Sequence, residues 1–157
     1  MAVIPRPPFF DTFIHIYFSF VEEGRERASE ISKSVEDAGY VVWKGTEKGL
    51  TDEEMCQGVA RCAVMCVCLT ENYYVEAKVR SEIQYAFECN KPILMLQVDN
   101  EGRDECWLQP YLANKKIMDF ADPFQDKISM PALLQAFGKA GKKEELLKAE
   151  KKQVRNP

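Results

Sequence analysis

Apolar and polar residues follow one another along this chain in blocks that predict an alternation of strands and helices. The predicted strands are short runs of β-branched, aromatic or cysteine residues with almost no charge, as expected for strands buried on both faces. They are residues 13–20, 40–43, 63–69, 93–96 and 117–120. The predicted helices place apolar residues along one helical face. They are residues 22–38, 51–60, 73–90 and 130–137.

Local signals mark where several of these elements begin and end. Gly39 supplies the left-handed residue that commonly ends a helix. Thr51 and Glu54 have the spacing of a capping box, in which both side chains satisfy free amides at a helix start. A strand, a helix and a further strand in succession form a right-handed crossover unit with parallel strands. The predicted fold class is therefore α/β, a flavodoxin-like doubly wound sheet of about five parallel strands with helices on both faces.

One domain accounts for most of the 157 residues. We expect a proline-rich leader at 1–10, a folded body at 11–137, and a basic tail at 138–157 that is rich in Lys and Glu and is helical or disordered. The leader lacks the basic start, apolar core and cleavage site of a secretory signal. No apolar run approaches the roughly 20 residues that cross a bilayer. We therefore expect a cytoplasmic protein without a membrane span.

Charge and cysteine content argue against two kinds of partner. The net charge is −4, and the body without its tail carries 14 basic and 22 acidic residues, which disfavours nucleic acid as a partner. The six cysteines include no CxxC pair and His15 is the only histidine, so we expect no metal site. Four of the six cysteines lie in predicted buried elements, where reduced cysteine behaves as a small hydrophobe.

The residues required by several common sites of α/β sheets are missing. A P-loop needs its glycine and lysine directly after a strand, whereas Gly141-Lys142 lies in the tail. The turn after the first strand, Val21-Glu22-Glu23-Gly24, is not a dinucleotide-binding glycine turn. Leu69-Thr70-Glu71 offers no aspartate to accept a phosphate. A hydrolase triad is not expected, because the chain has a single histidine and no G-x-S-x-G elbow.

Three features remain after these exclusions: a carboxylate on a helix, a loop with two glycines, and the two tryptophans, Trp43 and Trp107. Glu82 lies on the predicted helix at 73–90, one position off its apolar stripe, where we expect it to be half-sheltered. Helix spacing alone also fits a surface glutamate paired with Lys78, one turn earlier. The loop after the strand at 40–43 is long and contains two glycines. Loops of this kind on a rigid α/β scaffold tend to carry contacts.

Several fragments of the chain occur in a characteristic order. They are Phe18-Ser19-Phe20, Gly39-Tyr40-Val41-Val42-Trp43, Val67-Cys68-Leu69-Thr70-Glu71-Asn72-Tyr73, Val79-Arg80-Ser81-Glu82-Ile83-Gln84-Tyr85-Ala86 and Lys91-Pro92-Ile93-Leu94. Later come Trp107-Leu108 and Met118-Asp119-Phe120. In this order and spacing, residues 11–137 resemble a TIR domain (Toll/interleukin-1 receptor family). The resemblance implies the TIR version of the flavodoxin-like fold and a role in innate-immune signal transduction.

The resemblance also implies an enzyme site centred on Glu82. In the family a tyrosine is followed, after a short gap, by Cys-x-x-Glu; Glu82 matches the glutamate, and Val79 stands where cysteine is common. TIR domains with this glutamate include enzymes that split NAD+ at the nicotinamide–ribose bond, so Glu82 is the expected catalytic residue of an NAD+ nucleosidase. One carboxylate suffices, because nicotinamide is a good leaving group and the main demand is to stabilise an oxocarbenium-like ribose. NAD+ is then a substrate, and no cofactor is expected.

The same resemblance implies residues for binding and assembly. The expected substrate-binding residues, whose aromatic members can stack on nicotinamide, are Ser19, Phe20, Trp43 and Trp107. The glycine-containing loop matches the BB loop of the family, an expected contact with other TIR domains. It comprises Lys44, Gly45, Thr46, Glu47, Lys48, Gly49 and Leu50. We expect a homo-oligomer, because TIR enzymes typically assemble their site between neighbouring copies.

Two departures from the family keep other functions open. Val21-Glu22-Glu23 places acidic residues where NAD+-cleaving relatives often have basic residues suited to phosphates, and Gly45 stands where many relatives have an acidic residue. The alternative function is a non-catalytic adaptor or scaffold that assembles with other TIR domains through residues 44–50 and the helix at Val75–Phe87. A third alternative is a nucleoside-processing enzyme of the same sheet type, which also uses one glutamate against a ribose.

Overall fold

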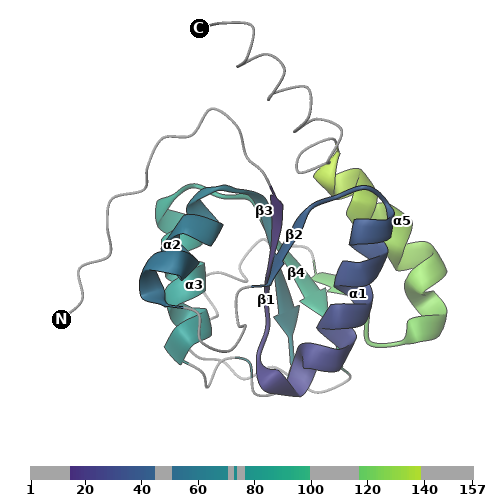
Figure 1. The fold of residues 1–157 in the computed structure, drawn as a ribbon. Coiled ribbons are helices and arrows are strands. Elements are labelled where there is room, and N and C mark those ends of the chain that lie inside the picture. The colour runs from purple at the N-terminus through teal and green to yellow at the C-terminus, as the bar shows by residue number, and fades with distance from the viewer. Residues whose placement is uncertain (1–14, 45–50, 71–72, 74–76, 100–116, 139–157) are drawn as a thin grey trace, which may run out of the picture.

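A parallel sheet of five strands forms the centre of the computed structural model (Figure 1). The structure describes residues 15–44, 51–70, 73, 77–99 and 117–138. The strands are β1 (His15–Ser19), β2 (Val42–Lys44), β3 (Cys62–Leu69), β4 (Ile93–Gln97) and β5 (Ile117–Asp119). Their order across the sheet is β2-β1-β3-β4-β5, and every neighbouring pair is parallel. The predicted flavodoxin-like α/β fold is therefore confirmed.

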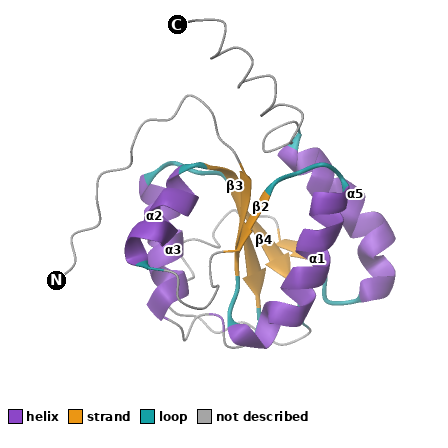
Figure 2. Ribbon diagram, in the orientation of Figure 1, coloured by secondary structure: helices purple, strands orange, loops and turns teal. Residues whose placement is uncertain are grey.

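Helices cover both faces of this sheet (Figure 2). One face carries α2 (Asp52–Ala60) and α3 (Ala77–Glu88), and the other carries α1 (Arg25–Asp37) and α5 (Asp126–Phe137). The short 3-10 helices η1 (Glu22–Gly24) and η3 (Pro123–Gln125) lead into α1 and α5. In a sheet of this type, ligands bind beyond the carboxyl ends of the strands. A ligand-binding site is therefore expected near the carboxyl ends of β1 and β3.

Most predicted element boundaries agree with the structure. Gly39 follows α1 with φ of +99°, and Thr51 and Glu54 form the predicted capping box of α2. The strand predicted at 40–43 begins instead at Val42. The closing helix starts at Asp126 rather than at residue 130, because the Asp122 side chain caps the turn η3 that leads into it. The largely polar first turn of α5 gave no apolar spacing that could reveal this start.

Some predictions concern segments outside the described ranges. They include the leader at 1–10, the tail beyond residue 138, the segment around Trp107, and residues 45–50 of the loop that resembles the BB loop. The expected domain limits at residues 11 and 137 therefore stay predictions.

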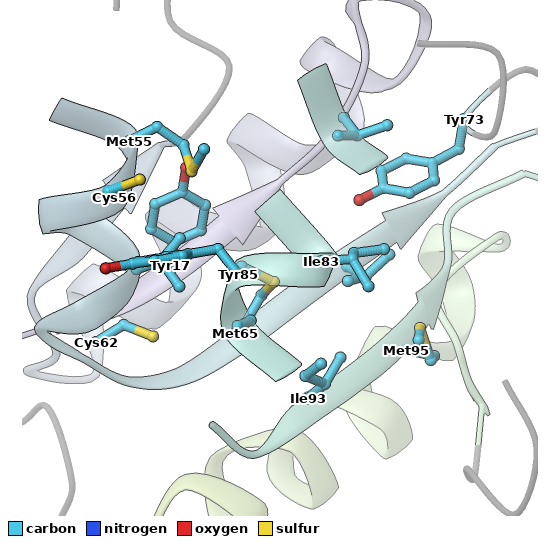
Figure 3. Close-up of a cluster of buried hydrophobic side chains, with 14 of the residues drawn as sticks. Tyr17, Met55, Cys56, Cys62, Met65, Tyr73, Ile83, Tyr85, Ile93 and Met95 are labelled. Carbon is cyan, nitrogen blue, oxygen red and sulfur yellow. The ribbon is translucent and has the colours of Figure 1, made fainter. Parts of the chain in front are cut away.

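Alternate side chains of β1 point to opposite faces of the sheet and divide the core into two layers. The odd-numbered positions carry polar or hydroxyl groups and face α2 and α3; they are His15, Tyr17 and Ser19. The even-numbered positions Ile16 and Phe18 are apolar and, with Phe20 directly after the strand, belong to the cluster on the α1 and α5 side. Figure 3 shows Tyr17 within the apolar cluster on the α2 and α3 side of the sheet. The α2–α3 layer is therefore the one that holds polar groups of β1.

Cysteine side chains fill part of this core, as predicted. Of the four in predicted elements, Cys56, Cys66 and Cys68 are buried and Cys89 is half-buried; Cys62, just before the strand predicted at 63–69, is buried as well. Burial raises the pKa of Cys62 and Cys68 to about 12, so both thiols stay neutral. Within the described ranges, no group of three or more His, Cys, Asp or Glu side chains could hold a metal ion. In that same part of the chain, no helix has the length and apolar character needed to cross a membrane.

Candidate functional site

Glu82 lies on α3 with its side chain turned toward β1, and it is completely buried, at 0% exposure. The prediction of a half-sheltered position was therefore wrong. The apolar stripe of α3 includes Val79, Ile83 and Ala86, but the buried arc of the helix is wider than this stripe and includes Glu82. The alternative of a surface pair with Lys78 is also not what the structure shows. Both residues are described, and no ion pair joins them, although the Lys78 charge acts on Glu82 at longer range.

Three hydroxyl groups surround the Glu82 carboxyl group. Two come from β1, on Tyr17 and Ser19, and the third belongs to Tyr73, which follows β3. The Ser19 and Tyr73 hydroxyls share a buried hydrogen bond of 2.6 Å. The Tyr17 hydroxyl lies close enough to interact with Glu82, yet no hydrogen bond of regular geometry joins the two groups. Neither Glu82 oxygen has a hydrogen-bond partner in the part of the chain that the structure describes.

Burial controls the protonation of this group. It raises the pKa of Glu82 from its ordinary 4.5 to about 7, while the Tyr17 hydroxyl, the Lys78 charge and the Ser19 hydroxyl lower it in part. The pKa values of Tyr17 and Tyr73 are raised as well, first by burial and then by the Glu82 charge, so both phenols keep their protons. Glu82 is thus a carboxyl group that exists in both charge states near neutral pH, and the donors that lie beside it among the described residues are hydroxyl groups.

The other expected site residues are distributed over both faces. Ser19 lies beside Glu82. Trp43 of β2 is partly buried against the α2–α3 cluster and stacks on His15, with ring centroids 5.2 Å apart. Phe20 is 1% exposed in the cluster on the α1 and α5 side, where the Arg25 guanidinium lies 5.5 Å from the ring centre. Trp107 lies outside the described residues. The structure therefore brings Ser19 to Glu82, but it places Phe20 in the layer on the other face of the sheet.

The sequence profile of the TIR domain family matches residues 16–132, which is most of the described sheet and helices. The chain belongs to the TIR domain family. The fold is also similar to the crystal structure of the TIR domain of the Toll-related receptor TRR-2 from Hydra magnipapillata, with a TM-score of 0.64 and 12% sequence identity. That similarity covers 78% of this chain and 96% of the Hydra chain. A search of curated proteins found no match.

Membership of this family has two general consequences. TIR domains typically bind other TIR domains, and the family includes members that cleave NAD+. In this TIR domain, the loop that resembles the BB loop begins at Lys44, the last residue of β2, and its remaining residues lie outside the described ranges.

The acidic turn after β1 is partly compensated by a neighbouring charge. Glu22 forms an ion pair with Arg25, with 2.7 Å between Oε2 and Nε. Both side chains are exposed to solvent, so the pair contributes little to stability. It does place a positive charge directly beside the acidic turn, where the sequence alone indicated only carboxylates that repel phosphate.

Sequence reasoning missed Tyr17 and Tyr73 as parts of the site. The sequence pattern predicts Tyr73 as the start of a helix and Tyr17 as one of several aromatic residues of a buried strand. A signal for Tyr17 was present in the period-two pattern of β1, which places His15, Tyr17 and Ser19 on one face of the strand. Three side chains with hydrogen-bonding groups on one face of a central strand are unusual for a purely structural core.

Proposed function

We propose that this TIR domain cleaves NAD+ at the nicotinamide–ribose bond and that Glu82 is its catalytic carboxylate. The observation that carries the proposal is the state of Glu82: a fully buried carboxyl group, without a hydrogen-bond partner among the described residues, whose pKa is about 7. Strongly perturbed carboxyl groups of this kind are enriched at functional sites.

A purely structural role explains this glutamate poorly. Raising the pKa from 4.5 to about 7 means that the ionised form in the folded chain is disfavoured by about 3 kcal/mol. A leucine or methionine at this position would fill the same space without that cost. Natural proteins accept such costs mainly where the group performs chemistry.

The chemistry needs one carboxylate and a fixed ribose. The bond between nicotinamide nitrogen and ribose C1′ breaks, and the electron pair leaves with nicotinamide. A carboxylate beside the ribose stabilises the positive charge that develops on the ring and accepts hydrogen bonds from its hydroxyls. Water then adds its oxygen to C1′ and loses one proton, which gives ADP-ribose. The Ser19 hydroxyl is well placed to support the ribose once its bond to Tyr73 is exchanged.

Substrate must reach a residue that has no exposed surface in the single chain. The proposal therefore includes self-association: contact between copies rearranges the surroundings of α3 and opens Glu82 to NAD+. TIR domains typically bind other TIR domains, which makes a second copy the natural partner. Activity should then rise more steeply than in proportion to protein concentration.

The experiment is nicotinamide release from NAD+ by the purified chain at high protein concentration with a crowding agent. Glu82→Gln should abolish release, since the amide keeps the shape of the side chain and removes its charge. Glu88→Gln is the matched control, because Glu88 is exposed at the end of the same helix. Absence of release from the wild type, under conditions where light scattering shows self-association, would contradict the catalytic proposal.

The complete burial of Glu82 and an exposed side chain on the same helix favour a second candidate, a non-catalytic adaptor. Phe87 is 54% exposed on α3, within the helix expected to contact other TIR domains. An adaptor would lose self-association on Phe87→Ser and would be unaffected by Glu82→Gln. An enzyme that assembles its site would lose NAD+ cleavage with either variant.

A further inference from the structure

The Tyr17 hydroxyl is buried on the same side of the sheet as Glu82 and has no regular hydrogen bond in the described part of the chain. Tyr17 projects from β1 into the α2–α3 layer, where its ring packs in the apolar cluster that includes Met55 and Cys56 (Figure 3). Its hydroxyl and the Glu82 carboxyl group are therefore two buried, unpartnered polar groups that lie beside each other.

The ring of Tyr17 is held firmly in this place. A Cβ atom added at Gly58 of α2 would lie 3.0 Å from Cε2 of the ring, so the helix backbone approaches the ring closely. Tyr17 is 0% exposed. A hydroxyl on such a fixed ring can move little, so its position relative to α3 is defined by the fold.

A structural role does not explain this hydroxyl. Burying a hydroxyl without a hydrogen bond is unfavourable, and phenylalanine would fill the same space without that penalty. The neighbouring Ser19 and Tyr73 hydroxyls are already bonded to each other. Lys78 acts on Glu82 only through its charge, as a group on the same helix. The bond between Ser19 and Tyr73 uses one of their two hydroxyl hydrogens, whereas, among the described hydroxyls around Glu82, Tyr17 is the one that makes no hydrogen bond at all.

We propose that Tyr17 is a positioning residue for Glu82: its hydroxyl donates a hydrogen bond to the ionised carboxylate and holds that carboxylate in one orientation. While Glu82 is buried and protonated, its carboxyl group lies next to the Tyr17 hydroxyl without a hydrogen bond of regular geometry. Ionisation of Glu82 draws the phenol hydrogen toward the nearer oxygen. The catalytic part of this inference rests on the proposed function, whereas the interaction itself does not.

The first test measures the ionisation of Glu82 directly. Carbon-13 NMR of the chain labelled at glutamate Cδ gives the titration midpoint of Glu82, assigned by its absence in Glu82→Gln. Tyr17→Phe should move this midpoint upward, because the anion loses its donor. Tyr85→Phe is the control: Tyr85 lies in the same layer, but its hydroxyl interacts with Cys89. An unchanged midpoint in a folded Tyr17→Phe chain would overturn the proposal.

A measurement on the unaltered protein guards against a variant that fails to fold. With tyrosine labelled at Cζ, the Tyr17 resonance should shift with the midpoint of the Glu82 titration, and this step should vanish in Glu82→Gln. A Tyr17 resonance that does not respond across that range would contradict the proposal.

Turnover separates this inference from the proposed function. If the wild type cleaves NAD+, Tyr17→Phe should lower kcat on the order of ten- to a hundredfold with a smaller change in KM, because a misplaced carboxylate affects the reacting state most. A normal kcat would overturn the catalytic part. If the wild type cleaves no NAD+, the proposed function fails, and the two NMR titrations still decide whether Tyr17 holds Glu82.

Discussion

The imidazole Nε2 of His15 and the carbonyl oxygen of Gly58 lie 2.6 Å apart and join the first residue of β1 to α2. Because a carbonyl oxygen only accepts, Nε2 carries the proton and donates. Burial lowers the pKa of His15 from its ordinary 6.5 to about 4; the bond to Gly58 opposes this shift, and the charges of Arg61 and Lys91 add to it. The ring is therefore a neutral structural donor at physiological pH, and no catalytic role is needed to explain it.

This relationship predicts how stability depends on acid. Between pH 6.5 and about 4 the unfolded chain protonates His15 while the folded chain does not, so stability falls as pH falls through this window. The loss attributable to His15 reaches about 3 kcal/mol. Urea unfolding at pH 7 and pH 4 measures it by comparing the wild type with His15→Gln, which keeps a donor but does not titrate. An identical pH dependence of the two proteins would refute the assignment.

Glu82 predicts the opposite dependence in nearly the same window. The folded chain binds its proton more tightly than the unfolded chain, so its contribution is complete below pH 4.5 and is lost as pH rises through about 7. Glu82→Gln removes this loss. The variant should therefore gain stability relative to the wild type with rising pH, by about 3 kcal/mol above pH 7. Chemical denaturation at pH 4.5 and pH 8 measures the difference in free energy of unfolding between the variant and the wild type. If this difference is the same at both pH values, Glu82 titrates normally and the prediction is wrong.

The same carboxyl group predicts the pH profile of the proposed reaction. Stabilising a positive ribose requires the ionised form, which becomes the major form above about pH 7. NAD+ cleavage should therefore rise with pH as Glu82 ionises. Initial rates of nicotinamide release between pH 5.5 and pH 9 provide the measurement. A rate that is highest at pH 5.5 would indicate a protonated catalyst instead.

Gly58 is required where α2 crosses β1 and β2. An added Cβ would lie 2.9 Å from two atoms of the Trp43 indole and 3.0 Å from the Tyr17 ring. Alanine favours a helix by about 1 kcal/mol over glycine, but overpacking against two rings costs about 1–3 kcal/mol. Gly58→Ala should therefore lower the free energy of unfolding, whereas Gln57→Ala, at an exposed neighbouring position, should change it by less than about 0.5 kcal/mol. Thermal and urea unfolding of both variants distinguish the two cases.

The fold was largely predictable because each strand has a local signature. The runs at 63–69 and 93–96 carry no charge, and the crossover rule then places them side by side and parallel. The capping box of α2 was predictable for the same reason, since Thr51 and Glu54 interact within one turn.

The site was predictable only in part. Its central residue came from a resemblance in a short motif, but the burial of Glu82 depends on which arc of α3 faces β1. The polar groups beside it depend on pairings between distant parts of the chain: Ser19 and Tyr73 are 54 positions apart. Helical spacing contains no information on such pairings, so only the structure shows which hydroxyl groups lie near Glu82.

Because the side chains of β1 alternate between the two faces of the sheet, substitutions near Glu82 and substitutions in the opposite layer of the core can occur independently of each other. Substitutions at 17 and 19 act on the layer around Glu82, whereas those at 16 and 18 act on the packing against α1 and α5. During evolution such a domain could therefore replace the hydroxyls at positions 17 and 19 and the carboxylate at 82, and so change from enzyme to adaptor, while its packing against α1 and α5 stays the same. Similarity of fold among these domains is then a poor guide to which of them retain chemistry.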